Sequence, residues 1–211
     1  MIKIENLNKS YKSRKNLISR GEEIDIFNNL NISIPLNSFT AVTGLNGSGK
    51  TTLFKILSGY TSMDSGTITI NNLDYLKYIK KNRVFLISSE DRSFYYRLTI
   101  SQNLKFFANI FNIFLTQEEI DEKLDFLGLI DKKNSFYYEL STGMKQKLSL
   151  ARALLIKPDI LILDEMERGI DSIMLEKIFN YLVKLKDITI IYSTHQKKLV
   201  DRADFVIRLE K

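Results

Sequence analysis

The decapeptide TGLNGSGKTT, residues 43–52, constrains the fold of this chain more than any other segment. It follows the short apolar run FTAVTG, opens the helical pattern KTTLFKILSGY, and has the spacing G-x-x-x-x-G-K-T at Gly44, Gly49, Lys50 and Thr51. Glycines at this spacing let the backbone wrap a phosphate with several N–H groups, and a helix N-terminus favours an anion. Lys50 can reach the β- and γ-phosphates, and the Thr51 hydroxyl can bind Mg²⁺. The segment therefore predicts a nucleotide-binding loop between a buried strand and a helix.

Strand patterns and helical patterns alternate at both ends of the chain. Strands are expected in MIKIENLNKSY, IFNNLNISIPL, FTAVTG, SGTITI, VFLIS, DILILDE, ITIIYST and FVIRL, with a hairpin or loop in the polar stretch 12–23. From about residue 100 to 130 apolar residues recur at helical spacing, and Thr116 and Glu119 match a capping box. Two more helices are expected in MKQKLSLARALLI and IMLEKIFNYLVKL. We predict an α/β fold: a P-loop NTPase core with a mostly parallel sheet, an N-terminal antiparallel β subdomain and an inserted α-helical subdomain.

Length and charge narrow the class of protein. The chain has 211 residues and a formal net charge of +6, but its basic residues are scattered, so we expect solvated faces and no nucleic-acid partner. It has no cysteine, no apolar run of the roughly 18–20 residues that span a bilayer, and no apolar signal-peptide core. We predict one cytoplasmic domain over 1–211, with 1–90 and 150–211 as the nucleotide-binding core and 91–149 as the helical subdomain.

Two adjacent carboxylates end the apolar run PDILILDE. Asp164 can hold Mg²⁺ directly or through water, and Glu165 can polarise an attacking water. Phosphoryl transfer needs both charge neutralisation and an oriented nucleophile, so the pair fits the chemistry that the glycine-rich loop implies. A bare Asp-Glu pair at the start of a loop is the alternative interpretation.

The one histidine of the chain, His195, follows the apolar run IIYST. A single histidine near a strand is more often structural than catalytic, but parallel strands of such a sheet bring their carboxyl ends to one ligand-binding edge. His195 is therefore expected near Lys50 and Glu165, where it can donate a hydrogen bond to the γ-phosphate and hold the water.

A second anion-binding helix start is expected in ELSTGMKQKLSLARALL. Ser141 and the backbone N–H of Gly143 precede a strong helical pattern. The first loop already cradles the triphosphate of its own chain. A second phosphate-binding cap is therefore expected to act between two copies that face each other head to tail, each cap closing over the partner's nucleotide. An ordinary serine-capped helix is the alternative.

Together these segments resemble the nucleotide-binding subunit of ATP-binding cassette (ABC) transporters over nearly the whole chain. GLNGSGKTT resembles the Walker A motif, ILILDE the Walker B motif, GID the D-loop, STH the H-switch, and LSTGMKQ the signature, in a variant found among export-type members. The resemblance implies ATP and Mg²⁺ as ligands. The residues that it implies for the nucleotide are Tyr11 (stacked on adenine), Gly44, Asn46, Gly47, Ser48, Gly49, Lys50, Thr51, Thr52, Ser141, Gly143 and Asp171. Those that it implies for catalysis are Lys50, Glu165 and His195, and those for the metal are Thr51, Asp164 and Glu90.

The sequence departs from the family pattern in two places. The glutamine expected after VFLIS is missing, and Ser89 or Glu90 takes its place, so we expect one of these oxygens to ligate Mg²⁺. The neighbouring RSFYYRL is rich in aromatics and is expected to face a membrane subunit, local packing being the alternative. After Walker B the usual Pro-Thr-Ser is Met166, Glu167 and Arg168, which leaves the geometry around Asp171 open.

The resemblance implies an ATPase subunit that powers a separate transmembrane permease, with a second ABC ATPase subunit as partner and two ATP between them. The signature variant favours export, and the site of action is the inner face of the cell membrane. Two alternatives stay open: a soluble ABC ATPase acting on nucleic acid or ribosomes, and an ATP-binding regulatory module with little turnover.

Overall fold

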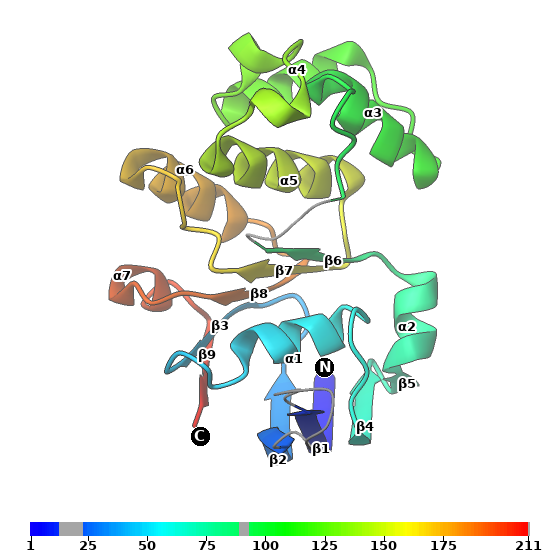
Figure 1. Cartoon of the computed structure of the whole chain (residues 1–211), viewed down its shortest axis with the longest axis vertical. Coiled ribbons are helices and arrows are strands. Elements are labelled where there is room, and N and C mark those ends of the chain that lie inside the picture. The colour runs from blue at the N-terminus through cyan, green and yellow to red at the C-terminus, as the bar shows by residue number, and fades with distance from the viewer. Residues whose placement is uncertain (13–22, 89–92, 211) are drawn as a thin grey trace, which may run out of the picture.

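The computed structural model describes residues 1–12, 23–88 and 93–210 (Figure 1). Most of the stretch 12–23, expected as a hairpin or loop, lies outside the described residues. The described strands form two sheets, and the helices flank them. Within the described ranges no helix is both long enough and apolar enough to cross a bilayer.

The central sheet is fully parallel, with the order β6-β7-β8-β3-β9. Its strands are β3 (Phe39–Gly44), β6 (Val84–Ile87), β7 (Ile160–Asp164), β8 (Thr189–Ser193) and β9 (Phe205–Leu209). Every residue of β7 and β8 is buried, because a parallel sheet is covered on both faces. The short apolar runs of the sequence are therefore the central strands, as predicted.

The second sheet is antiparallel, with the order β2-β1-β4-β5. Its strands are β1 (Ile2–Lys12), β2 (Glu23–Ile34), β4 (Ser65–Ile70) and β5 (Leu73–Asp74). Alternate residues of β1 are buried, which is the period-2 pattern of a sheet with one face on the core. The predicted N-terminal antiparallel layer is confirmed.

The central sheet separates two hydrophobic clusters, one on each of its faces. On one face Leu161 and Leu163 join the cluster that includes α5 (Thr142–Ile156) and α6 (Ser172–Leu182). On the other face Ile160 and Ile162 join the cluster of α1 (Lys50–Leu57) and the antiparallel sheet. Successive residues of β7 thus serve opposite layers, as strand geometry requires.

The middle of the chain is helical, as predicted. Figure 1 shows α3 (Ile100–Ile110) and α4 (Gln117–Phe126) with α5 at one end of the molecule, and β1, β2 and β4 at the other. Thr116 and Glu119 form the expected capping box, and Thr99 with Gln102 forms a second one. The remaining helices were not predicted, because each is short and lacks a full apolar period: α2 (Tyr75–Lys81), η1 (Ile130–Lys132), η2 (Tyr137–Glu139) and α7 (Lys197–Val200).

Candidate active site

The phosphate loop leaves β3 at Gly44 and enters α1 at Lys50. A Cβ at Gly44 would lie 2.6 Å from both the Leu209 carbonyl oxygen and Ser48 Oγ, and a Cβ at Gly49 would lie 2.6 Å from the ring of Phe27. Gly49 also has φ 95°, a conformation that side-chain-bearing residues rarely adopt. Both glycines are therefore required by close packing around the loop, while Asn46 and Gly47 lie exposed at its turn.

The polar groups of the loop converge on its inner side. Lys50 is 6% exposed, and its Nζ donates to the carbonyl oxygens of Gly44 (2.8 Å) and Leu45 (3.0 Å). The buried hydroxyl of Ser48 has no hydrogen-bond partner among the described residues. A buried cation, a free hydroxyl and a tight glycine cradle fit the phosphates of a nucleotide, with Thr52 following in the first turn of α1.

A hydroxyl of the phosphate loop lies within hydrogen-bonding distance of a carboxylate at the end of β7. Thr51 Oγ1 donates to Asp164 Oδ2 at 2.7 Å, so the sheet brings together the hydroxyl and the carboxylate that the sequence assigns to Mg²⁺. Hydroxyl and carboxylate oxygens are the hard ligands that Mg²⁺ prefers, with phosphate oxygens completing its shell. The pair therefore fits the metal. Glu90 and Ser89, the other expected ligands, lie outside the described residues.

Ser193, at the end of β8, joins the two carboxylate residues of β7. Its hydroxyl donates to Asp164 Oδ1 at 2.8 Å and accepts from the backbone N–H of Glu165 at 2.9 Å. Sequence reasoning did not assign Ser193 a role. Its place directly before Thr194 and His195, at the carboxyl end of an apolar strand, was the available signal.

Glu165 and His195 meet at the carboxyl edge of the sheet, as predicted. His195 Nε2 lies 3.2 Å from Glu165 Oε1. Glu167 Oε1 accepts from Thr194 Oγ1 at 2.7 Å and from the His195 backbone N–H at 3.3 Å, so it fixes the segment that carries the histidine. Sequence reasoning noted Glu167 only as a departure from the family pattern.

The other oxygen of Glu165 is bound by a residue that sequence reasoning gave no role. Arg168 Nη2 lies 2.5 Å from Glu165 Oε2 in an ion pair across one turn. The Glu165 side chain is 19% exposed and that of Arg168 is 63% exposed. Glu165 itself has φ 49°, a left-handed conformation that is uncommon for a residue with a side chain.

The second predicted anion site lies at the N-terminus of α5. Ser141 is the N-cap, and its Oγ accepts from the Met144 N–H at 3.3 Å. Gly143 is buried, and a Cβ there would overlap the carbonyl oxygen of Gly169 in the loop after β7. Asp171 caps α6 by accepting from the Met174 N–H at 2.9 Å. The start of α5 thus packs against the loop that follows β7 in the same chain.

Tyr11 lies near the end of β1 and is 41% exposed. The ammonium of Lys9 lies 5.3 Å from the centre of its ring and 2.7 Å from Asp64 Oδ1. Hydrogen bonding from Lys9 and from the Ser10 backbone lowers the pKa of Asp64 to about 2. The tyrosine that the resemblance assigns to adenine therefore has a solvent-facing ring held beside a paired cation.

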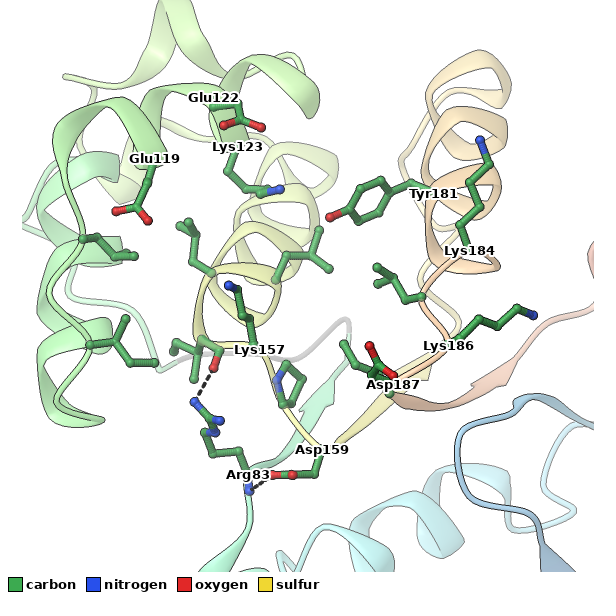
Figure 2. Close-up of a pocket in the computed structure, with 18 residues that line it drawn as sticks. Arg83, Glu119, Glu122, Lys123, Lys157, Asp159, Tyr181, Lys184, Lys186 and Asp187 are labelled. Atoms are coloured by element: carbon green, nitrogen blue, oxygen red, sulfur yellow. Dashed lines mark hydrogen bonds between the residues drawn. The ribbon is translucent and has the colours of Figure 1, made fainter.

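A cavity of about 800 Å³ lies apart from the phosphate loop and the Glu165–His195 pair, and it is lined by α4, the end of α5 and the end of α6 (Figure 2). Figure 2 shows Arg83 and Asp159, which directly precede β6 and β7, at one side of it. The cavity thus lies toward the amino ends of these strands, whereas the phosphate loop and Glu165 follow carboxyl ends. The residues predicted for the site do not line it, so it is not part of the candidate active site.

Comparison with known proteins decides the family. The family model described as ABC transporter matches residues 27–167, which include the phosphate loop, the helical region and the carboxylate pair. The chain belongs to the ABC transporter family. The resemblance seen in the motifs is therefore confirmed.

Curated relatives match over almost the whole chain. The bacitracin transport ATP-binding protein BcrA of Bacillus licheniformis is 36% identical over 92% of this chain and 61% of its own length. The lantibiotic transport ATP-binding protein SrtF of Streptococcus pyogenes is 33% identical over 98% of this chain and 85% of its own. The chain spans only 37% of an export ATP-binding/permease relative from Rickettsia typhi, at 30% identity.

A solved structure matches the fold throughout. The ATP-binding cassette MJ0796, in a dimeric post-hydrolysis state bound to ADP and Pi, superposes with a TM-score of 0.85 at 25% identity, covering 100% of this chain and 94% of that one. The predicted P-loop NTPase architecture of an ABC cassette is therefore confirmed.

Proposed function

We propose that this ABC cassette binds and hydrolyses ATP and that it does so as a head-to-tail dimer with two nucleotides at the interface. The observation that carries the proposal is the convergence of Lys50, the Thr51–Asp164 pair and the Glu165–His195 pair on one sheet edge. Binding of triphosphate, charge neutralisation and orientation of water are the three requirements of phosphoryl transfer, and each has a residue here.

The roles follow from chemistry and position. The loop N–H groups, Ser48 and Lys50 bind the phosphates, and Mg²⁺ held by Thr51 and Asp164 supplies charge neutralisation when bound. Glu165 accepts a proton from the attacking water, while His195 orients that water and donates to the γ-phosphate. Tyr11 stacks on adenine. A further metal ligand in this proposal is Glu90, with Ser89 as the alternative.

The second half-site comes from the partner subunit. Ser141 and Gly143 at the start of α5 close over the partner's nucleotide, and Asp171 lies in the loop that joins the two sites. The dimer named in the matched MJ0796 structure supports this arrangement. Binding of nucleotide closes the dimer and hydrolysis opens it, so the affinity difference between the two states does the mechanical work.

We further propose that this work drives a separate transmembrane permease, in export. Five large side chains around α3 are 37–85% exposed, namely Tyr95, Tyr96, Phe106, Phe111 and Phe114. Beneath them the guanidinium of buried Arg152 lies 4.4 Å from the ring centre of Phe94 and 4.7 Å from that of Phe107. An aromatic surface on a packed base suits a protein partner, and the transport names of the relatives support a permease at the membrane.

In this proposal the nucleotide-binding core is 1–90 with 150–211 and the helical part is 91–149, with α5 continuous across the boundary.

Hydrolysis of Mg·ATP by the purified chain tests the activity. We expect turnover by the wild-type chain and its near-complete loss in Glu165→Gln, which retains nucleotide binding. Equal turnover by the two proteins would refute the assignment of the base. Co-purification with a membrane protein, lost on Tyr95→Ser with Phe114→Ser, tests the partner.

A further inference from the structure

Arg168 is one of three residues after β7 that depart from the family pattern, and it contacts the expected general base directly. Its Nη2 lies 2.5 Å from Glu165 Oε2, while His195 Nε2 lies 3.2 Å from Oε1. Each oxygen of the Glu165 carboxylate thus has a protein partner. A carboxylate oxygen that accepts from a guanidinium is less free to accept from a water O–H at the same position.

The backbone between the two residues forms a tight turn. The Arg168 N–H donates to the Glu165 carbonyl oxygen at 3.3 Å, and Glu165 at φ 49° begins this turn in a left-handed conformation. Such backbone strain is found where surrounding contacts hold a residue in a functional position. Here the contacts are the Arg168 ion pair and the Ser193 hydroxyl on the Glu165 N–H.

The same turn is bound to the signature helix α5. With its amide nitrogen facing the turn, buried Gln146 donates to the carbonyl oxygens of Met166 and Arg168. Gly143 approaches Gly169 so closely that a Cβ on Gly143 would overlap the Gly169 carbonyl oxygen. A displacement of the start of α5 must therefore move the backbone that carries Arg168.

We propose that Arg168 is a positioning residue that holds the Glu165 carboxylate in a resting orientation, and that closure of the dimer withdraws it through α5. The inference rests on the proposed role of Glu165 as the base. In the closed dimer the partner's nucleotide engages Ser141 and Gly143, α5 shifts, and Arg168 leaves Oε2 free for the attacking water. Arg168 is 63% exposed, so it can leave the carboxylate without disturbing the core.

Turnover at saturating Mg·ATP tests this proposal in the purified full chain. Arg168→Ala should raise kcat about two- to fivefold with KM for ATP little changed, because ion pairs of partly exposed side chains are weak. Arg168→Lys keeps a cation without the guanidinium fork, so its kcat should lie between that of the wild-type chain and that of Arg168→Ala. Arg202→Ala is the matched control, since Arg202 pairs with Glu176 at 2.9 Å on the outer side of α6.

Salt provides a second readout that a purely structural residue would not move. Because salt screens exposed ion pairs, raising the ionic strength to on the order of 0.5 M should raise the wild-type kcat relative to that of Arg168→Ala. An unchanged or lower kcat in folded Arg168→Ala overturns the proposal, and a lower value would place Arg168 among the groups that promote turnover. Failure of the proposed function looks different, because Glu165→Gln would then hydrolyse ATP as fast as the wild-type chain.

Discussion

The phosphate loop and the loop after β7 occupy the same edge of one sheet, yet they differ in how closely they follow the family pattern and in the contacts that they make. The phosphate loop matches the family motif at every fixed position, and its groups point inward onto buried Lys50 and Ser48. The loop after β7 replaces the usual Pro-Thr-Ser with Met166, Glu167 and Arg168. Glu167 accepts from the His195 N–H, and Arg168 pairs with Glu165. The phosphate loop therefore keeps the family motif, whereas the loop after β7 makes contacts particular to this chain, and in our proposal it is these contacts that set the rate of turnover.

The largest effect is expected in the phosphate loop. Lys50→Ala removes a charged donor from a buried site, so we expect ATP affinity to fall about 100-fold, which is about 2.7 kcal/mol. Equilibrium titration with a fluorescent ATP analogue measures it. Lys77→Ala, which removes an exposed lysine of α2, is the control and should bind as the wild type does. Affinity within threefold of wild type in Lys50→Ala would break the assignment of this loop.

A smaller effect is expected at Ser193, which supports the residues at the start of the loop after β7. Ser193→Ala leaves Asp164 Oδ1 and the Glu165 N–H without the shared hydroxyl, so the free energy of unfolding should fall by about 1–3 kcal/mol. Because the Asp164 carboxylate and the backbone that positions Glu165 lose support, kcat should fall more than the affinity for ATP. Chemical denaturation and steady-state kinetics measure the two effects. Ser62→Ala, at an exposed position, is the control, and equal stability of both variants would show that the Ser193 hydroxyl does not support Asp164 and Glu165.

The smallest effect is expected in the stability of the protein at acid pH. It comes from Asp64, whose partner Lys9 lies beside the ring of Tyr11. The folded pKa of Asp64 is lowered to about 2 from an ordinary 3.8, so its contribution is complete above the ordinary value and is lost as pH falls toward 2. Since the Asp64 side chain is 43% exposed, we expect at most about 1 kcal/mol. Asp64→Asn should flatten the loss of stability between pH 4 and about 2, and Asp125→Asn, an exposed change in α4, should not. Identical acid limbs in Asp64→Asn and wild type would contradict the Lys9 pairing.

The sequence was sufficient for the elements whose residues repeat a simple period. Strands β3, β7 and β8 were found because strands buried on both faces are continuous apolar runs, and the carboxyl ends of parallel strands then bring Lys50, Glu165 and His195 together. The capping box at Thr116 was found because its two side chains recur at a fixed spacing.

The contacts that spacing does not determine were missed. The Arg168–Glu165 ion pair depends on the left-handed backbone at Glu165. No glycine or asparagine at that position indicates such a conformation in the sequence. The double role of Ser193 depends on the register of β8 against β7, in which Asp164 pairs with Ser193. Gly143 was predicted as a nucleotide contact, and its approach to Gly169 follows only from the tertiary packing of α5.

Sedimentation velocity of Glu165→Gln with and without saturating Mg·ATP tests the central claim most directly. If two chains must enclose the nucleotide, the variant sediments as a dimer with Mg·ATP, as a monomer without it, and as a monomer in both cases once Lys50→Ala is added. A Glu165→Gln chain that binds Mg·ATP fully and still sediments as a monomer would contradict the account.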